Sequence, residues 1–228
     1  MTIRGEIARA PAGVIGFDTP ERLNSVRARQ YFNKGYRFCV RYVSHDKSVA
    51  SRFQDLTEEE GQIIVDAGMA LMVVQHPLKE GWTPTEKLGR RFGQNAAAYA
   101  SDAGVPQGVN VWLDLEGVKA GTPDTDVIAF CNAWFNEVDS VGYESGVYVG
   151  ASPGLNADQL YWDLKTKHYW KGGSSAKAGV PDDIPHRGYQ LIQRIQNAGT
   201  AYEFDSDVTK IDNFGDGVMW LANAPTVA

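Results

Sequence analysis

Two carboxylates stand two positions apart in the short apolar segment VWLDLE at residues 111–116. Side chains alternate between the faces of a strand, so Trp112, Asp114 and Glu116 share one face and the apolar residues share the other. Two neighbouring carboxylates cannot both ionise cheaply, so the pKa of one should rise and make it a general acid. That pairing is what hydrolysis of a glycosidic bond requires. The same pattern also fits a salt-bridge pair, a helix N-cap or part of a Ca²⁺ site.

Polar and aromatic residues at the ends of other apolar runs extend this set. In a barrel of parallel strands, the reactive groups gather at the carboxyl ends of the strands. We therefore predict a catalytic set of Glu116, Asp114, Asp18 and Asp205, and a substrate-binding set of Tyr42, Gln75, Tyr148, Trp170, Gln190 and Asp207. Asp18 equally suits a cap for a helix starting near Pro20. The DSD segment at 205–207 suits a turn as well as a site.

Other chemistries find no support in the sequence. The four histidines, His45, His76, His168 and His186, lack the spacing of zinc ligands, so we expect no metal site. No serine lies in a nucleophile-elbow context, and no glycine-rich loop suggests a phosphate site. The sequence therefore predicts no cofactor.

Short apolar runs alternate with longer amphipathic runs along the chain. We expect strands at 14–17, 37–43, 70–74, 110–115, 146–149, 168–170, 189–194 and 201–204, and helices at 22–34, 57–68, 83–104, from 122 onward and at 157–164. Strands separated by helices form parallel sheets, and eight such units favour closure. Residues 171–186 form a Gly/Ser/Pro-rich loop, and only a short turn precedes the last strand. The prediction is an α/β protein, a single (β/α)8 TIM-type barrel that is irregular in its last third.

Length and composition suit one domain. We assign residues 1–12 to an N-terminal extension, 13–222 to the barrel and 223–228 to a C-terminal tail. The net charge is −6 and no basic run occurs, so we expect no nucleic-acid partner. No segment approaches ~18 consecutive apolar residues, and the first residues lack the apolar stretch of a secretory signal. We therefore expect no membrane insertion, and the oligomeric state stays open.

Two cysteines, Cys39 and Cys131, lie in apolar surroundings. We expect two buried thiols, although sequence alone leaves a single disulfide open because it does not give their distance.

Five segments together resemble a known family. They are GVIGFDT at 13–19, VNVWLDLEG at 109–117, SGVYVG at 145–150, YQLIQ at 189–193 and FDSDV at 204–208. Their order resembles that of the family 25 glycoside hydrolases, which are lysozyme-like muramidases. The chain is more similar still to a bacterial glycoside hydrolase-like domain group, long filed as a domain of unknown function. That similarity includes LTEEE at 56–60 and GVPQG at 104–108, and spans roughly residues 13 to 220.

The resemblance implies an enzyme that cleaves the glycan of bacterial peptidoglycan. By position, Glu116 is similar to the family's general acid, and Asp114 to its partner, a nucleophile or the group that orients the acetamido substituent. Asp18 and Asp205 match further acidic residues, with Asp207 close enough to exchange roles with Asp205. Tyr148 and Gln190 fall at pocket-lining positions. The chain departs from the muramidases at Asp-Thr-Pro after the first strand and in having two late aspartates.

These departures leave two alternatives beside a hydrolase. One is a non-catalytic module that binds cell-wall glycan, and the other is a structural domain of a secretion or phage apparatus. For a hydrolase and for a glycan-binding module alike, the partner is a glycan, and we expect it to be peptidoglycan. Because no leader is recognisable, we expect such a protein to reach the wall by export through another route or by lysis.

Overall fold

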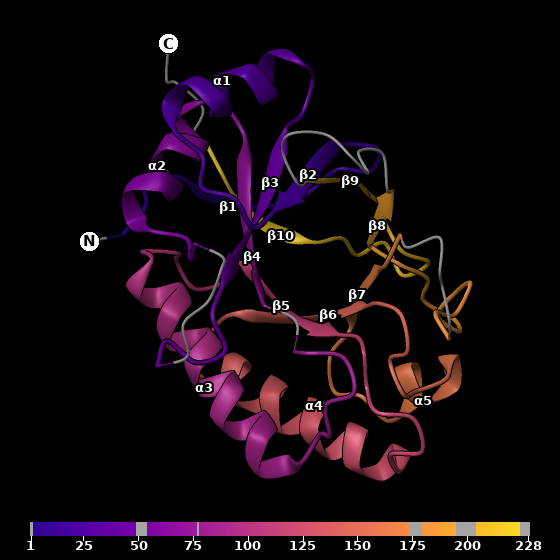
Figure 1. The fold of residues 1–228 in the computed structure, drawn as a ribbon. Coiled ribbons are helices and arrows are strands. Elements are labelled where there is room, and N and C mark those ends of the chain that lie inside the picture. The colour runs from indigo at the N-terminus through magenta and orange to yellow at the C-terminus, as the bar shows by residue number, and fades with distance from the viewer. Residues whose placement is uncertain (1, 49–53, 77, 174–178, 195–203, 224–228) are drawn as a thin grey trace.

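The computed structural model describes residues 2–48, 54–76, 78–173, 179–194 and 204–223. Its strands are β1 (Glu6–Arg9), β2 (Ile15–Thr19), β3 (Phe38–Val43), β4 (Ala70–Gln75), β5 (Asn110–Leu115), β6 (Glu144–Val149), β7 (His168–Lys171), β8 (Leu191–Arg194), β9 (Asp205–Thr209) and β10 (Met219–Ala222). Its helices are α1 (Ser25–Asn33), α2 (Glu58–Asp66), α3 (Glu86–Asp102), α4 (Asp124–Ser140) and α5 (Ala157–Trp162). Strands β2 to β9 pair in sequence order, and β9 returns to β2, which closes an eight-stranded barrel (Figure 1).

The barrel confirms the predicted fold class, with one strand in a different place and direction. The eighth strand was expected at 201–204, but β9 begins at Asp205, and residues 201–203 lie outside the described part of the chain. It runs antiparallel to both β8 and β2, whereas β2 to β8 are mutually parallel. Residues 195–204 separate β8 from β9 and are too few for a parallel crossover, which needs about a dozen residues or more, so the short connection favours an antiparallel β9.

Helix starts depend on which side chain caps the first turn. α2 starts as predicted, since the Thr57 hydroxyl accepts the Glu60 N–H at 3.3 Å. α3 was expected to start at Thr83-Pro84, but it begins two residues later because the Thr85 hydroxyl accepts the Leu88 N–H. The shorter α1 likewise follows Asn24, whose side chain accepts the Arg27 N–H.

Two strands that the sequence analysis did not predict lie at the amino-terminal end of the barrel. β1 pairs antiparallel with β10, and β10 joins β4 through the Leu221–Leu71 pair. β1 lies within the segment 1–12, which was expected to be an extension. Trp220 of β10 packs 5.7 Å from the Phe38 ring, so this pair of strands adds to the core.

Helices α3 and α4 lie side by side against the outside of β5 and β6 (Figure 1). Glycines on α3 allow this close approach. A Cβ on Gly89 would lie 2.1 Å from the Phe130 carbonyl oxygen, and one on Gly93 would lie 2.6 Å from that of Trp134. The closely packed helices cover the outer face of β5, the strand that carries Asp114 and leads into Glu116.

The barrel interior is filled by large side chains below the polar end. Trp112 is fully buried and occupies the space left by Gly146, where a Cβ would lie 2.4 Å from its ring. Trp170 packs edge-on against it, with ring centroids 5.7 Å apart. Cys39 and Cys131 are both buried and free. Among the described helices, none is long and apolar enough to cross a membrane.

Candidate active site

Inward-facing side chains from seven strands meet at the carboxyl end of the barrel. They are Asp18 on β2, Tyr42 on β3, Asp114 on β5, Tyr148 on β6, Trp170 on β7, Gln193 on β8 and Asp207 on β9. Each is joined to at least one of the others by a hydrogen bond, a ring contact or a charge interaction. We call this set, together with Glu116 and Asp205, the acidic cluster.

Asp18 accepts hydrogen bonds on both carboxylate oxygens. The Tyr42 hydroxyl donates to Oδ1 and the Gln193 amide donates to Oδ2, each at 2.8 Å. Burial raises the pKa of Asp18 to about 6, and these two hydrogen bonds oppose the rise. Gln193 is itself fixed, since its Oε1 accepts from the Tyr148 hydroxyl at 2.9 Å and from the Gly173 N–H at 3.0 Å. The Gln193 amide therefore connects β8 to β2, to β6 and to the segment after β7.

Asp207 lies deeper in the barrel, beside Trp170. The indole N–H of Trp170 donates to Asp207 Oδ1 at 2.9 Å, and the carboxyl group is almost completely buried. Burial, followed by the charge of Asp18, raises the pKa of Asp207 well above its usual range. A protonated Asp207 can donate to the Asp18 carboxylate, which lets two acidic groups share the interior.

Asp114 and Glu116 face the same side, as the strand alternation predicted. Asp114 is 8% exposed, and its Oδ1 has no hydrogen-bond partner among the described residues. Burial, then the charges of Glu116 and Asp18, raises the pKa of Asp114 well above its usual range. Glu116 follows the end of β5 and is half-buried, and burial followed by the charge of Glu80 raises its pKa. The pair therefore retains a proton more readily than free carboxylates do.

Small residues and a neighbouring loop position Glu116. A Cβ on Gly150 would lie 2.5 Å from Glu116 Oε2, so only glycine leaves room for this carboxylate. The Trp82 indole donates to the Glu116 carbonyl oxygen at 2.7 Å, and the Gly81 N–H donates to the Gly117 carbonyl at 2.8 Å. The loop before α3 thus holds the end of β5 and brings Glu80 close to Glu116.

The two late aspartates share one face of β9 because they are two residues apart. Asp205 is the first residue of β9 and pairs in register with Asp18. Since β9 runs antiparallel, its beginning lies at the mouth, so Asp205 is at the rim and Asp207 is below it. Asp205 is half-buried, and burial raises its pKa.

Two predicted binding residues are not brought into the acidic cluster. Gln75 points outward, where its amide bonds the carbonyls of Ser44 and Phe92 and accepts from the Trp134 indole. Gln190 is fully buried, and its amide accepts the Tyr169 N–H and donates to the Lys167 carbonyl and to Asp212. Both glutamines satisfy buried backbone and side-chain groups, which is a structural use.

Gln193 and Glu80 are the neighbours that sequence analysis missed. Gln193 shares the inward face of β8 with Leu191, so strand parity alone was a signal for it once the strand bounds were known. Glu80 is exposed and lies on a loop, and no periodic pattern marks such a residue.

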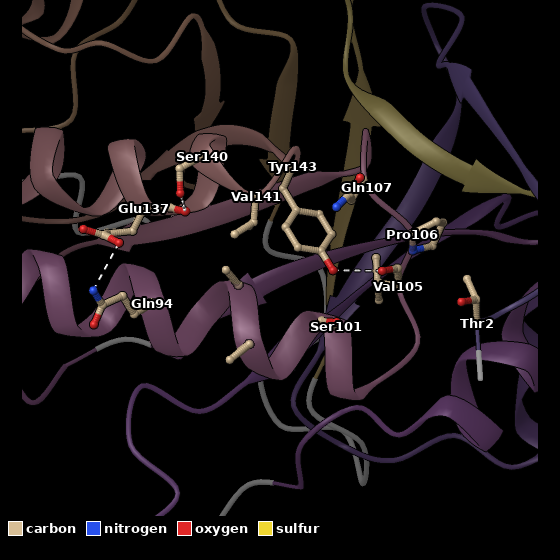
Figure 2. Close-up of a pocket in the computed structure, with 12 residues that line it drawn as sticks. Thr2, Gln94, Ser101, Val105, Pro106, Gln107, Glu137, Ser140, Val141 and Tyr143 are labelled. Atoms are coloured by element: carbon tan, nitrogen blue, oxygen red, sulfur yellow. Dashed lines mark hydrogen bonds between the residues drawn. The ribbon is translucent and has the colours of Figure 1, made fainter.

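A hollow lies away from the acidic cluster, at the carboxyl-terminal halves of α3 and α4. It has a volume of about 690 Å³, and half of its lining residues are Ala, Ser or Gln (Figure 2). Gln94 donates to Glu137 at 3.2 Å across it, and the Tyr143 hydroxyl donates to the Val105 carbonyl at 2.9 Å. Glu137 is the one carboxylate in its lining, so the hollow lacks the paired carboxylates of the barrel mouth.

Comparisons with known proteins agree with this architecture. A family model described as an Rv2525c-like, glycoside hydrolase-like domain matches residues 29–214. No curated protein sequence gives a significant match.

Three solved structures illustrate the likeness of fold. An uncharacterised B. stearothermophilus protein is 19% identical with a TM-score of 0.66, covering 87% of this chain and 96% of that one. The Mycobacterium tuberculosis Tat-secreted protein Rv2525c is 14% identical with a TM-score of 0.64, over 90% and 98%. A family 25 glycosyl hydrolase from Bacillus anthracis is 12% identical with a TM-score of 0.56, over 87% and 89%. At these identities the likeness is one of fold.

Proposed function

This chain belongs to the family of Rv2525c-like, glycoside hydrolase-like domains, and from that premise we propose that it hydrolyses glycosidic bonds in bacterial cell-wall peptidoglycan. The acidic cluster is the reaction site in this proposal. The observation that carries it is the pair Asp114 and Glu116, two carboxyl groups on one face at the end of β5. Burial raises the pKa of both, followed by the charge of Glu116 for Asp114 and by that of Glu80 for Glu116. The fold shared with a family 25 glycosyl hydrolase supports the choice of substrate class.

Glu116 serves as the general acid. It is the more accessible member of the pair and lies just past the end of β5, where a glycan entering from the mouth arrives first. A protonated Glu116 donates its proton to the glycosidic oxygen as the bond to the sugar breaks. The charge of Glu80 beside it favours the protonated form before substrate binds.

Asp114 lies deeper and acts on the sugar itself. Its buried Oδ1 has no hydrogen-bond partner among the described residues, so its capacity to accept a hydrogen bond is unused in the protein alone. In the reactive form the pair holds one proton, on Glu116, and Asp114 is ionised. As Glu116 protonates the leaving oxygen, the Asp114 carboxylate stabilises the positive charge that develops on the ring, directly or by forming a covalent bond. Water then completes the hydrolysis.

Asp18, Asp205 and Asp207 complete the site as further acidic groups. Asp18 is held by Tyr42 and Gln193, which orients its carboxylate toward the interior. Its charge raises the pKa of Asp114, so it favours a protonated pair. The buried rings of Tyr148 and Trp170 pack edge-on beside the carboxylates, with ring centroids 4.8 Å apart.

The test is release of reducing sugar ends from purified peptidoglycan. Glu116→Gln keeps the shape of the side chain and removes the transferable proton, so we expect hydrolysis to fall at least ~100-fold. Glu59→Gln, an exposed change on α2, is the matched control and should retain wild-type activity.

The outcomes separate the two readings of the site. Full activity in Glu116→Gln would contradict the role of Glu116. If the wild-type protein releases no reducing ends but still sediments with cell walls, the result would instead favour a glycan-binding module with the same barrel.

A further inference from the structure

An exposed aromatic surface lies at the amino-terminal end of the barrel, opposite the acidic cluster. Trp162 ends α5, and His186 precedes β8 in the loop that leads to it. Phe214 follows the antiparallel β9, whose end also lies at the amino-terminal side. Trp162 and Phe214 are 66% and 60% exposed, which is high for side chains of this size.

The rings of Tyr161, Trp162 and His186 are in contact with one another. Trp162 lies edge-on to Tyr161 at 4.7 Å and to His186 at 5.6 Å between ring centroids. His186 has a φ of 63°, an uncommon conformation for a residue with a side chain. The Asn213 amide donates to the His186 carbonyl at 3.3 Å, and the Asn213 N–H donates to the Arg187 carbonyl at 2.9 Å. These bonds join the Trp162 and Phe214 sides of the surface.

Two cations flank the rings. The Lys167 ammonium lies 5.5 Å from the Tyr161 ring centroid, and the Arg187 guanidinium lies 4.9 Å from that of Phe214. Arg187 pairs with Asp212 and Asp216, whereas the Lys167 ammonium has no ion-pair partner among the described residues. Burial, followed by the charge of Arg187, lowers the pKa of Lys167. Arg187 is therefore compensated by carboxylates, and Lys167 is the cation of this surface that can pair with an anionic ligand.

We propose that Trp162, Tyr161, His186, Phe214, Lys167 and Arg187 form a second binding surface for an anionic polysaccharide. The exposed Trp162 ring suits the apolar face of a sugar ring, and Lys167 suits a carboxylate carried by the polymer. Peptidoglycan, with its carboxylate-bearing peptide stems, is such a polymer. Its choice as ligand rests on the proposed function. Because the surface lies opposite the mouth, it holds the wall without blocking the acidic cluster.

Binding is measured by sedimentation with insoluble peptidoglycan sacculi. Every protein carries Glu116→Gln, so the wall remains intact whether or not the parent is a hydrolase. We expect Trp162→Ala to weaken binding about fivefold or more, and Trp162→Phe to retain most of it. Lys167→Gln should weaken binding at low salt and have little effect at high salt, because exposed charge is screened. Val26→Ala, which removes another exposed apolar side chain, is the control.

A local signal distinguishes this surface from the acidic cluster. The Trp162 indole N–H resonance, assigned from Trp162→Phe, should shift when soluble uncrosslinked glycan strands are added. Unchanged sedimentation of Trp162→Ala together with an unmoved indole resonance would overturn the proposal. The proposal would also be overturned if the protein bound anionic lipid vesicles through Trp162 but did not bind sacculi. Neither measurement depends on reducing-end release, so the failure of one proposal does not imply failure of the other.

Discussion

Gln190 and Gln193 stand three residues apart, yet their amides serve different parts of the molecule. Gln193 fixes Asp18 and Tyr148 inside the acidic cluster, whereas Gln190 joins β7 to Asp212 outside it. Both are buried, so removing either leaves hydrogen-bonding groups without a partner. The distinction between a positioning residue and a structural one is therefore visible in activity rather than in stability.

We expect Gln193→Ala and Gln190→Ala to lower the free energy of unfolding by similar amounts, about 1–3 kcal/mol each. Gln193→Ala should also lower kcat for peptidoglycan by about 100-fold, because Asp18 and Tyr148 lose their common anchor. Gln190→Ala should change kcat by less than about threefold. Denaturant unfolding and reducing-end release below the Tm of both variants check this. Equal loss of kcat in the two would contradict the assignment.

At the scale of elements, the direction of β9 and the packing of α3 position the carboxylates. The antiparallel β9 places Asp205 opposite Asp18, so the mouth gains acidic groups from the beginning of a strand rather than from its end. The contact of α3 with α4 depends on Gly89 and Gly93, which lie one helical turn apart. A backbone contact of this kind cannot adjust by rotating a side chain.

Gly89→Ala therefore tests whether α3 and α4 are in backbone contact, because helix propensity and packing predict changes of opposite sign in the free energy of unfolding. On helix propensity alone, alanine would stabilise α3 by about 1 kcal/mol. The added Cβ would lie 2.1 Å from the Phe130 carbonyl, so we expect a net destabilisation of about 1–3 kcal/mol instead. Chemical unfolding measures it, with the exposed Lys87→Ala on the same helix as the control. Stabilisation by Gly89→Ala would show that the two helices are packed less closely.

The two ends of the barrel differ: added strands extend the core at one end, and carboxyl groups gather at the other. β1 and β10 extend the core at the amino-terminal side, while the carboxyl end gathers several carboxyl groups with raised pKa values. A carboxyl group whose pKa is raised in the folded protein binds its proton more tightly there than in the unfolded chain. Its contribution to stability is therefore lost as pH rises through the window between the two values.

For Asp18 that window runs from 3.8 to about 6. We expect the stability of Asp18→Asn relative to wild type to rise by up to about 3 kcal/mol, or several degrees in Tm, as the pH increases through this window. Well below 3.8, Asp18 is protonated in both the folded and the unfolded state, so the difference should no longer change with pH. His45 and His168, whose pKa values burial lowers, act in the opposite direction but are common to both proteins. Thermal unfolding at pH values from below 3.8 to above 6 measures the difference, and a constant difference across this range would refute the assignment.

The amino-acid sequence by itself determined the fold class and the central carboxylate pair. Both follow from local rules: apolar runs alternate with amphipathic ones, and strand alternation puts Asp114 and Glu116 on one face. The family membership that the motifs indicated is confirmed by the family model. The roles of the individual residues stay predictions.

Only the tertiary structure decided which glutamine faces the mouth, which way β9 runs and what β1 and β10 do. A shift of one position turns a side chain from the interior to the helices, so Gln75 and Gln193 required the actual strand registers. β1 and β10 are four residues each, and their stability comes from pairing with partners far along the chain. The proximity of Asp18, Asp114 and Asp207 is likewise a consequence of barrel closure. Closure pairs β9 with β2, which are distant in sequence, and local sequence patterns do not predict such a pairing.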